Sequence, residues 1–364
     1  MQFKDSILQL PVYKPSNLTA TQPGSMVKLS SNENALGPSP RALAAMQAAI
    51  GLCHSYPDSS ALALRVALAN RVGLSPNRVI CGNGSDELIM LLSLGFLSEG
   101  DEAVMAAGTF ISYLLRTREM GGTAVQVPLR PDYTHNLPAM LAAITSRTRL
   151  LYVCNPNNPT GTSVGADEIS AFLAAVPDHV LVVMDEAYVE YAIRPDFPDT
   201  VAALRAGRKN LIILRTFAKI HGLAGLRLGY GLAHPEVIEY LHRARPVFNV
   251  NTLAQVGGLA ALDDEEHIAR TRAHAQRSRA FFEHELGMLG LQPIASETNF
   301  IAVYVGDDGA IAEELRQQGY AVMPISGWGV SGCIRISFGT MEQNAGFMAA
   351  LRYVLEQRSV LTSI

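Results

Sequence analysis

The chain has 364 residues, of which 48% are hydrophobic and 17% charged, and its formal net charge is -4. This composition excludes intrinsic disorder and fibrous structure and predicts a globular protein of two or three domains. Because the balance is slightly acidic and no block of like charges occurs, we expect no nucleic-acid or membrane partner, and small molecules are favoured.

Residues 1–30 contain three prolines and little periodicity, which predicts an extended N-terminal arm that packs with the small domain. No export signal is visible there, and the longest apolar stretches, 42–53 and 88–97, are too short to span a bilayer. The four cysteines form no CxxC pair, so we expect a reducing cytoplasm.

From about residue 78, short β-rich runs alternate with longer helical ones. The runs are 78–81, 103–106, 124–127, 150–153, 180–184 and 210–214. Because several of them lack polar alternation, the pattern predicts a mostly parallel sheet covered by helices on both faces, in a large α/β domain over 31–250. A ligand is then expected beyond the C-terminal ends of the strands.

After residue 230 the pattern changes to a long helical stretch over 252–286, followed by shorter segments at 299–305, 311–318, 333–337 and 342–356. These segments predict a smaller α+β domain over 251–364.

Lysine is rare in the chain, with only five residues, and two of them lie beyond residue 30. Lys209 lies in a polar turn and is expected at the surface. Lys219 follows the strand that ends at Leu214, among apolar residues and glycines. Burial and nearby cations would lower its pKa and favour the neutral amine that forms Schiff bases, although a surface lysine fits the local sequence equally well.

Asp185 follows the apolar run 180–184, where an open α/β sheet binds ligands. A buried carboxylate there needs a cationic partner. A metal is disfavoured because no Gly-Lys-Ser/Thr phosphate loop accompanies it, and the remaining alternative is an Asp that caps the next turn.

Two further segments also follow predicted strands. Residues 82–87, Gly-Asn-Gly-Ser-Asp-Glu, place glycines and hydroxyls at a helix start, which suits either an anion or ordinary helix capping. Residues 155–161, Asn-Pro-Asn-Asn-Pro-Thr-Gly, form a turn-rich loop.

Together these segments resemble the fold-type I pyridoxal-phosphate-dependent aminotransferases, and most closely the histidinol-phosphate aminotransferase family. The resemblance covers nearly the whole chain, with further matching segments at 10–15, 31–40, 56–58 and 334–340. It implies a cytoplasmic homodimer with pyridoxal 5'-phosphate as cofactor, which transfers an amino group from histidinol phosphate to a 2-oxo acid, usually 2-oxoglutarate, in histidine biosynthesis.

The resemblance also implies roles for residues that contact the ring of the cofactor. Lys219 forms the Schiff base and moves the proton, and Asp185 pairs with the pyridinium nitrogen. Asn158 and Tyr188 bond the phenolic oxygen, and Phe110 stacks on the ring.

The same resemblance implies the residues around the cofactor phosphate and the substrate. The phosphate is held by Gly84, Ser85, Asp86, Thr216 and Arg227, with Tyr56 from the neighbouring subunit. The substrate is bound by Arg335, Tyr13, Asn34 and Met323. No metal site is expected.

The chain departs from the family pattern at several positions, and two of them concern the phosphate groups. Ala218 stands where a serine usually contacts the phosphate, and Met323 stands where an arginine commonly holds the substrate phosphate. Trp328 either lines the substrate site or belongs to the core.

Three alternative functions therefore stay open: an aminotransferase for aromatic or other L-amino acids, a decarboxylase or oxidative deaminase with the same cofactor, and a ligand-binding protein that retains the fold.

Overall fold

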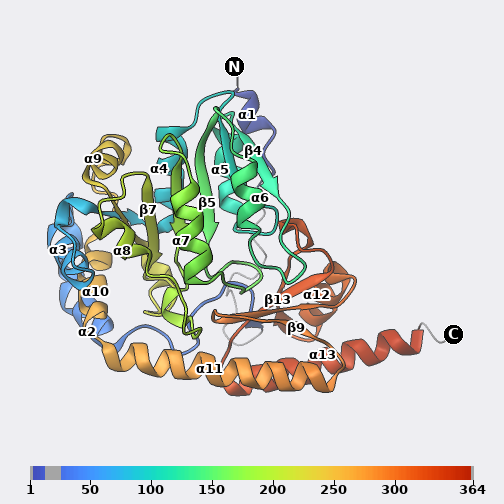
Figure 1. The fold of residues 1–364 in the computed structure, drawn as a ribbon. Helices are drawn as coiled ribbons and strands as arrows, with labels where there is room; N and C mark the ends of the chain where they lie inside the picture. The colour runs from blue at the N-terminus through green and yellow to red at the C-terminus, as the bar shows by residue number, and fades with distance from the viewer. Residues whose placement is uncertain (1–2, 13–25, 362–364) are drawn as a thin grey trace.

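The computed structural model describes residues 3–12 and 26–361, and a seven-stranded sheet lies at its centre (Figure 1). The sheet order is β2-β8-β7-β6-β5-β3-β4. Strand β8 runs opposite to the other six strands, which all run in the same direction. The strands are β2 (Val79–Asn83), β3 (Glu102–Ala106), β4 (Thr123–Val127), β5 (Thr148–Cys154), β6 (Leu181–Asp185), β7 (Leu211–Thr216) and β8 (Leu228–Ala233). The predicted mostly parallel α/β sheet is confirmed, whereas β8 was not predicted.

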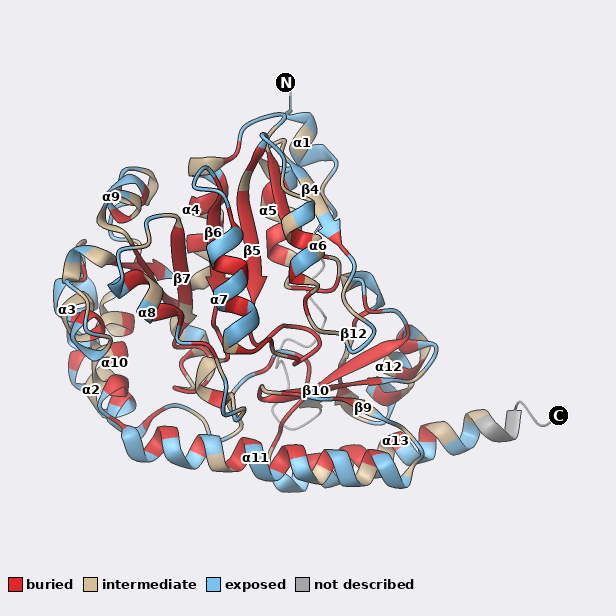
Figure 2. Cartoon of the chain, in the orientation of Figure 1, coloured by how far each residue is buried: buried red, intermediate tan, exposed pale blue. Residues whose placement is uncertain are grey.

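Helices cover both faces of this sheet because its strands are apolar on both faces. One face packs on α4 (Ser85–Phe96), α5 (Ile111–Glu119) and α9 (Pro235–Ala244). The other packs on α2 (Pro40–Ala49), α3 (Leu62–Arg71), α6 (Leu137–Ala142), α7 (Ala166–Ala175), α8 (Thr200–Arg205) and α10 (Thr252–Leu262). Figure 2 shows the central strands buried along their length, whereas the edge strand β4 is largely exposed or half-buried and α7 alternates between buried and exposed residues.

A second, antiparallel sheet has the order β12-β13-β10-β9. Its strands are β9 (Pro293–Ile294), β10 (Phe300–Tyr304), β12 (Met323–Pro324) and β13 (Cys333–Ser337). It packs with α11 (Glu265–Met288), α12 (Asp308–Gln317) and α13 (Met341–Leu361), and α11 runs beneath both sheets in Figure 1.

The single helix predicted over 252–286 is two helices, α10 and α11. Asp264 separates them, because its side chain accepts a hydrogen bond of 3.2 Å from the backbone N–H of His267 and so caps α11. The prediction missed this N-cap signal, which stands in the sequence as Asp264 before an acidic first turn.

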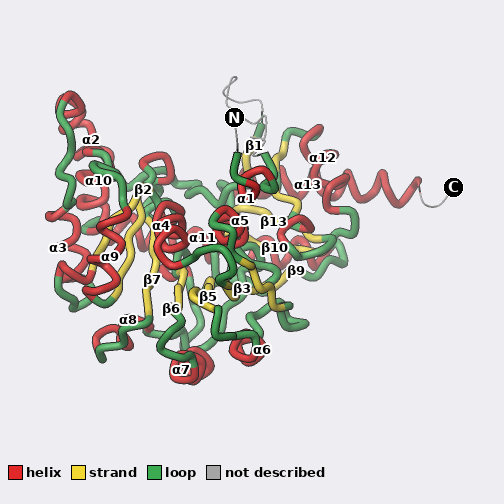
Figure 3. The backbone as a smooth tube through the Cα atoms, turned by 90° about the horizontal axis from the view of Figure 1, so that it is seen from above, coloured by secondary structure: helices red, strands yellow, loops and turns green. Residues whose placement is uncertain are grey.

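The first part of the chain contacts both halves of the protein. Helix α1 (Asp5–Leu8) lies near α5, where the Ser6 hydroxyl donates to the carbonyl of Glu119 at 3.0 Å. Strand β1 (Val27–Lys28) pairs in parallel with β11 (Tyr320–Ala321), near the second sheet (Figure 3). The residues after β1 therefore enter the space between the two sheets.

Short 3-10 helices complete the structure: η1 (Ile50–His54), η2 (Pro76–Arg78), η3 (Val189–Tyr191), η4 (Ala224–Leu226) and η5 (Ser326–Trp328). None of the described helices has the length and apolar character that a membrane crossing requires.

Candidate active site

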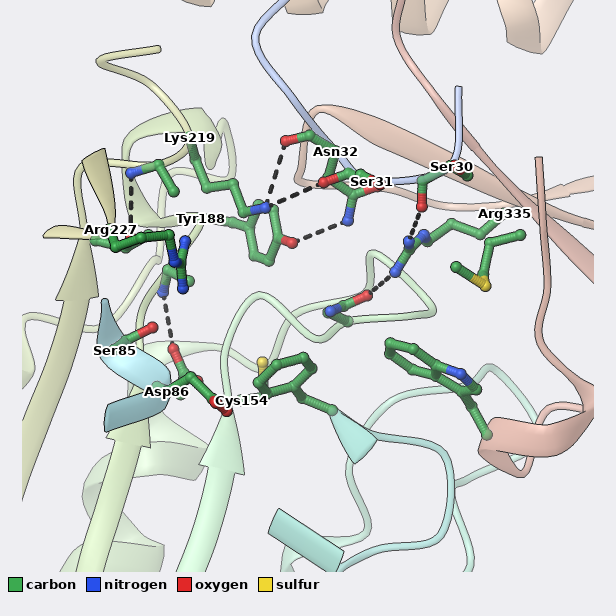
Figure 4. Close-up of a pocket in the computed structure, with 18 residues that line it drawn as sticks. Ser30, Ser31, Asn32, Ser85, Asp86, Cys154, Tyr188, Lys219, Arg227 and Arg335 are labelled. Atoms are coloured by element: carbon green, nitrogen blue, oxygen red, sulfur yellow. Dashed lines mark hydrogen bonds between the residues drawn. The ribbon is translucent and has the colours of Figure 1, made fainter. Parts of the chain in front are cut away.

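A cavity of about 260 Å³ lies between the C-terminal ends of the central strands and the second sheet (Figure 4). Residues from both sheets and from the segment after β1 line it. They are Ser30, Ser31, Asn32, Ser85, Asp86, Phe110, Cys154, Asn158, Asp185, Ala187, Tyr188, Thr216, Ala218, Lys219, Arg227, Met323, Trp328 and Arg335.

Lys219 lies in the loop after β7 and directs its amine into this cavity. The Nζ atom lies 3.4 Å from the carbonyl oxygens of both Ser31 and Asn32, and 5.5 Å from the centre of the Tyr188 ring. Burial, with the nearby guanidinium of Arg335 adding to it, lowers the pKa of Lys219 to about 8. About one tenth of this amine is therefore neutral and nucleophilic at pH 7, far more than for an ordinary lysine.

Asp185 ends β6 and is buried at the floor of the cavity. Its Oδ2 accepts a hydrogen bond of 2.6 Å from the hydroxyl of Tyr113, and its Oδ1 accepts one of 3.1 Å from the N–H of Ala187. Burial raises the pKa of Asp185 to about 6, and these two hydrogen bonds oppose the rise. The carboxylate is thus ionised at pH 7 and can face a cationic group. Sequence reasoning missed Tyr113, because nothing in its local sequence separates it from a core tyrosine.

An anion cradle forms at the start of α4. Gly84 has a φ of +80°, and a Cβ added there would lie 2.6 Å from the guanidinium of Arg227. A Cβ on Gly229 would lie 2.3 Å from the backbone nitrogen of Ser85. Only glycines allow this close approach, which exposes the N-terminus of α4 to Arg227 and suits a phosphate group.

Two further polar residues border this cradle. The carboxylate of Asp86 accepts hydrogen bonds from the hydroxyl of Ser112 and, at 3.3 Å, from the guanidinium of Arg116. Both partners lie on α5, so the carboxylate points toward that helix. Thr216 ends β7, and its hydroxyl accepts a hydrogen bond of 3.1 Å from the N–H of Ala218.

Arg335 reaches the cavity from β13 of the second sheet. It donates to Asn158 and, at 2.6 Å, to the carbonyl of Ser30, while its Nε atom has no partner. Its guanidinium carbon lies 5.4 Å from the ring centre of Trp328. Met323 faces Arg335 across the strand pair β12–β13 and also lines the cavity. Trp328 therefore belongs to the cavity wall, one of its two expected places.

The ring-facing residues expected from the sequence also reach the cavity. Asn32 donates a hydrogen bond of 2.9 Å to the hydroxyl of Tyr188. Phe110 lines the cavity beside Trp328, with 6.1 Å between the two ring centres. Asn32, Ser30 and Ser31 were not expected to line it.

Two residues expected at the site lie outside the cavity of this chain. Asn34 donates to the carbonyl of Ile220 at 3.0 Å and does not line the cavity. Tyr56 is 83% exposed and stacks on Phe248 outside the cavity, with 4.6 Å between ring centres. Tyr13 lies outside the described residues.

The cavity thus has an aldehyde-reactive amine, a buried carboxylate, an aromatic wall and an anion cradle, which together fit an aromatic aldehyde that bears a phosphate. The unpartnered Nε of Arg335 leaves a donor for a second anion. Among residues 3–12 and 26–361, no group of three His, Cys, Asp or Glu side chains could hold a metal ion.

The chain matches the family model described as "Aminotransferase class I and II" over residues 24–351. Because the match covers most of the chain, the protein belongs to this family.

Curated relatives narrow the family. The histidinol-phosphate aminotransferase of Moorella thermoacetica is 46% identical over 331 residues, which cover 91% of this chain and 86% of that protein. That of Akkermansia muciniphila is 43% identical over 356 residues, covering 96% and 97%. The chain is therefore a member of the histidinol-phosphate aminotransferase family.

Solved structures show the same fold. The crystal structure of histidinol-phosphate aminotransferase from Sinorhizobium meliloti in complex with pyridoxal-5'-phosphate is 30% identical and covers 98% of each chain, with a TM-score of 0.89. An aspartate aminotransferase from Thermus thermophilus, 23% identical with a TM-score of 0.84, covers 97% of this chain and 99% of its own and shares the fold. The expected fold-type I class is confirmed.

Proposed function

We propose that the protein is a pyridoxal-phosphate-dependent histidinol-phosphate aminotransferase that passes the amino group to a 2-oxo acid such as 2-oxoglutarate. One observation supports this most strongly: the Lys219 amine, with a pKa of about 8, shares a single cavity with Asp185, Arg335 and an anion cradle. The curated relatives, which are named histidinol-phosphate aminotransferases, support the same substrate.

Pyridoxal phosphate, when bound, supplies an aldehyde that links to amines and a ring that accepts electrons from the carbon next to the nitrogen. Lys219 would attach to it and afterwards carry the proton between that carbon and the cofactor, because a pKa near 8 lets the Nζ atom both accept and release a proton. Asp185 would face the ring nitrogen and hold its proton there.

Other residues orient the bound groups. The phosphate would lie at the N-terminus of α4, where Gly84, Ser85, Thr216 and Arg227 surround it. Phe110 would cover one ring face, and Asn158 and Tyr188 would bond the ring oxygen. With Ala218 in place of a serine, one hydroxyl contact is absent from this cradle.

Arg335 would bind the acidic group of each substrate in turn, the phosphate of histidinol phosphate or the α-carboxylate of the oxo acid. Its Nε is free for this, and Asn158 and Ser30 already fix its two terminal nitrogens.

We infer that the active protein is a homodimer in the cytoplasm, with an N-terminal arm, a large domain that includes α10, and a small domain built on the second sheet. Apolar side chains around Tyr56 support the dimer: Val247 is 72% exposed, and Ile50 and Leu52 are also exposed. A second copy that covers these residues would bring Tyr56 toward a neighbouring cavity.

A single-turnover experiment tests the proposal. Histidinol phosphate is added to the cofactor-loaded protein without oxo acid, and the cofactor spectrum and the ketone product are followed. A spectral change with one equivalent of ketone is the expected result. An unchanged spectrum with histidinol phosphate, but conversion by another amine, would reassign the donor.

A second donor class, aromatic L-amino acids, is favoured by one observation. Met323 and Trp328 give the wall beside Arg335 an apolar surface with no second cation from β12. Such a wall suits a donor with a single carboxylate and an aromatic side chain, and phenylalanine in the same experiment tests it.

A further inference from the structure

Glu186, which is buried, and Arg215, which is partly buried, form an ion pair at the ends of the neighbouring strands β6 and β7. Glu186 is 1% exposed and accepts two hydrogen bonds from Arg215, of 2.9 Å from Nε and 2.7 Å from a terminal nitrogen. The hydroxyl of Thr200 donates to its other oxygen. The backbone N–H of Glu186 also donates to the carbonyl of Leu214 at 2.8 Å, so the pair extends the β6–β7 ladder by one step.

Each member of the pair directly adjoins a cavity residue in the sequence. Asp185 precedes Glu186, and Thr216 follows Arg215. Because successive side chains of a strand point to opposite faces of the sheet, the ion pair lies behind the two residues that face the cavity. The Thr216 hydroxyl in turn bonds the backbone at the start of the loop to Lys219.

The core on either side of the sheet agrees with this alternation. Leu181 and Val183 of β6 pack in the same cluster as Tyr113, the partner of Asp185. Val182 and Met184 pack in the cluster on the opposite face, where Glu186 points by the same period.

The pair also balances charge immediately behind Asp185. Burial raises the pKa of Asp185, and the negative charge of Glu186 raises it further because it disfavours a second carboxylate charge nearby. Although burial opposes it, Glu186 raises the pKa of Arg215, so the guanidinium stays charged. The net charge of the pair is therefore zero.

Several other titratable groups surround these residues. Asp185 is faced by Tyr113 of α5, Cys154 of β5, Tyr188 and Lys219. The ion pair is faced by Tyr230 of β8, Glu190 of η3 and Arg272 of α11. Burial raises the pKa of Tyr113, Tyr188 and Cys154, so these three side chains stay neutral between pH 5 and 8. Lys219 carries charge in this range until it is attached to the cofactor.

We propose that Glu186 and Arg215 are positioning residues that act on the bound cofactor through Asp185 and Thr216. The inference rests on the proposed function, because pyridoxal phosphate is the ligand that Asp185 would face. The ion pair holds the two strand ends together and keeps the charge behind Asp185 at zero, so that Asp185 remains ionised and in place.

Three variants test this proposal: Glu186→Gln, Arg215→Met and the double variant. The readout is the dissociation constant of pyridoxal phosphate between pH 4.5 and 8, measured by quenching of protein fluorescence, together with the melting temperature. The loss of affinity at low pH is the acid limb of this profile, and Asp185→Asn shows which part of it belongs to the titration of Asp185. Glu239→Gln, which breaks the exposed pair with Arg243, is the matched control.

The proposal predicts shifts of opposite sign. Glu186→Gln leaves a net positive charge and lowers the midpoint of the acid limb by about one pH unit, whereas Arg215→Met leaves a negative charge and raises it by about one unit. The double variant returns to within roughly 0.3 unit of the unmodified protein, since its charge is again balanced. The Glu239→Gln control leaves the midpoint unchanged.

A purely structural role would lower the melting temperature of the single variants and leave both midpoints in place, or move them in the same direction, and either result overturns the proposal. If Arg215→Met does not fold, Glu186→Gln and the double variant decide, because the downward shift in one must be reversed in the other. An unmodified protein that binds no pyridoxal phosphate would instead overturn the proposed function, and this inference with it.

Discussion

Tyr113 donates a hydrogen bond of 2.6 Å to Asp185 from a fully buried position on α5. Its ring stacks on Tyr152, with 4.5 Å between ring centres and 9° between ring planes, which fixes the hydroxyl in place. This hydrogen bond favours the ionised form of Asp185 and opposes the effect of burial on its pKa. Tyr113 is thus a direct partner of the carboxylate on which the proposed reaction depends.

Replacing Tyr113 with Phe should raise the pKa of Asp185 above about 6, because a hydrogen bond to the ionised form is lost. A hydrogen bond to a charged group contributes about 1.5–3 kcal/mol, so the acid limb of kcat should move up by ~1 pH unit or more. The pH profile of kcat checks this. Tyr152→Phe is the control, since its hydroxyl contacts Ser93 at 3.2 Å and not Asp185. An equal shift in both variants would contradict the assignment.

The rate at which pyridoxal phosphate attaches to the apoprotein should depend on the protonation of Lys219. Only the neutral amine attacks an aldehyde. Burial is the main reason why the pKa of Lys219 is lowered to about 8. The rate should therefore rise about tenfold per pH unit below pH 8 and level off above it. Stopped-flow absorbance between pH 6 and 10 measures this. A rise that continues to pH 10 would mean an ordinary, solvated lysine.

Lys219→Ala should abolish covalent attachment of the cofactor while leaving the phosphate cradle intact. After reduction with borohydride, the intact mass of the unmodified protein should increase by one cofactor, and that of the variant should not. Lys209→Ala is the control, because Lys209 is an exposed residue whose amine lies 3.8 Å from Glu236. Labelling of the Lys219→Ala variant at one equivalent would disprove the assignment.

Gly84→Ala should weaken cofactor binding by at least tenfold. The new Cβ would meet the guanidinium of Arg227 at 2.6 Å, and the φ of +80° is unfavourable for a side chain. Gly207→Ala is matched in backbone, with a φ of +92°, but meets no atom within 4 Å. The two variants should lose similar stability, and only Gly84→Ala should change the dissociation constant of pyridoxal phosphate. Unchanged cofactor affinity in Gly84→Ala would place the phosphate elsewhere.

Met323→Arg should favour donors that bear a phosphate. A second guanidinium beside Arg335 would add a charge-assisted contact to a dianion, which should lower KM for histidinol phosphate about tenfold. The same change should raise KM for phenylalanine, because it removes an apolar wall. Met323→Leu keeps that wall and should alter neither value by more than about twofold. Unchanged KM values for both donors in Met323→Arg would show that residue 323 does not face the substrate.

The sequence by itself determined the alternation of apolar runs and helices, and with it the mostly parallel sheet. It also placed Asp185 and Lys219 after predicted strands, because each of them closely follows an apolar run in the sequence. Local patterns of this kind depend on the period of a strand or helix and need no long-range contact. The break at Asp264 was readable in the same way, as an N-cap signal.

The tertiary structure alone decided which distant residues meet at the cavity. Asn32 bonds Tyr188 across 156 positions of sequence, and Arg335 bonds Asn158 across 177. The antiparallel course of β8, the contact of Tyr113 with Asp185 and the pairing of Glu186 with Arg215 likewise depend on how strands and helices pack. Periodicity cannot reveal such contacts, because they form only when burial brings separate elements together and each buried polar group must find its partner.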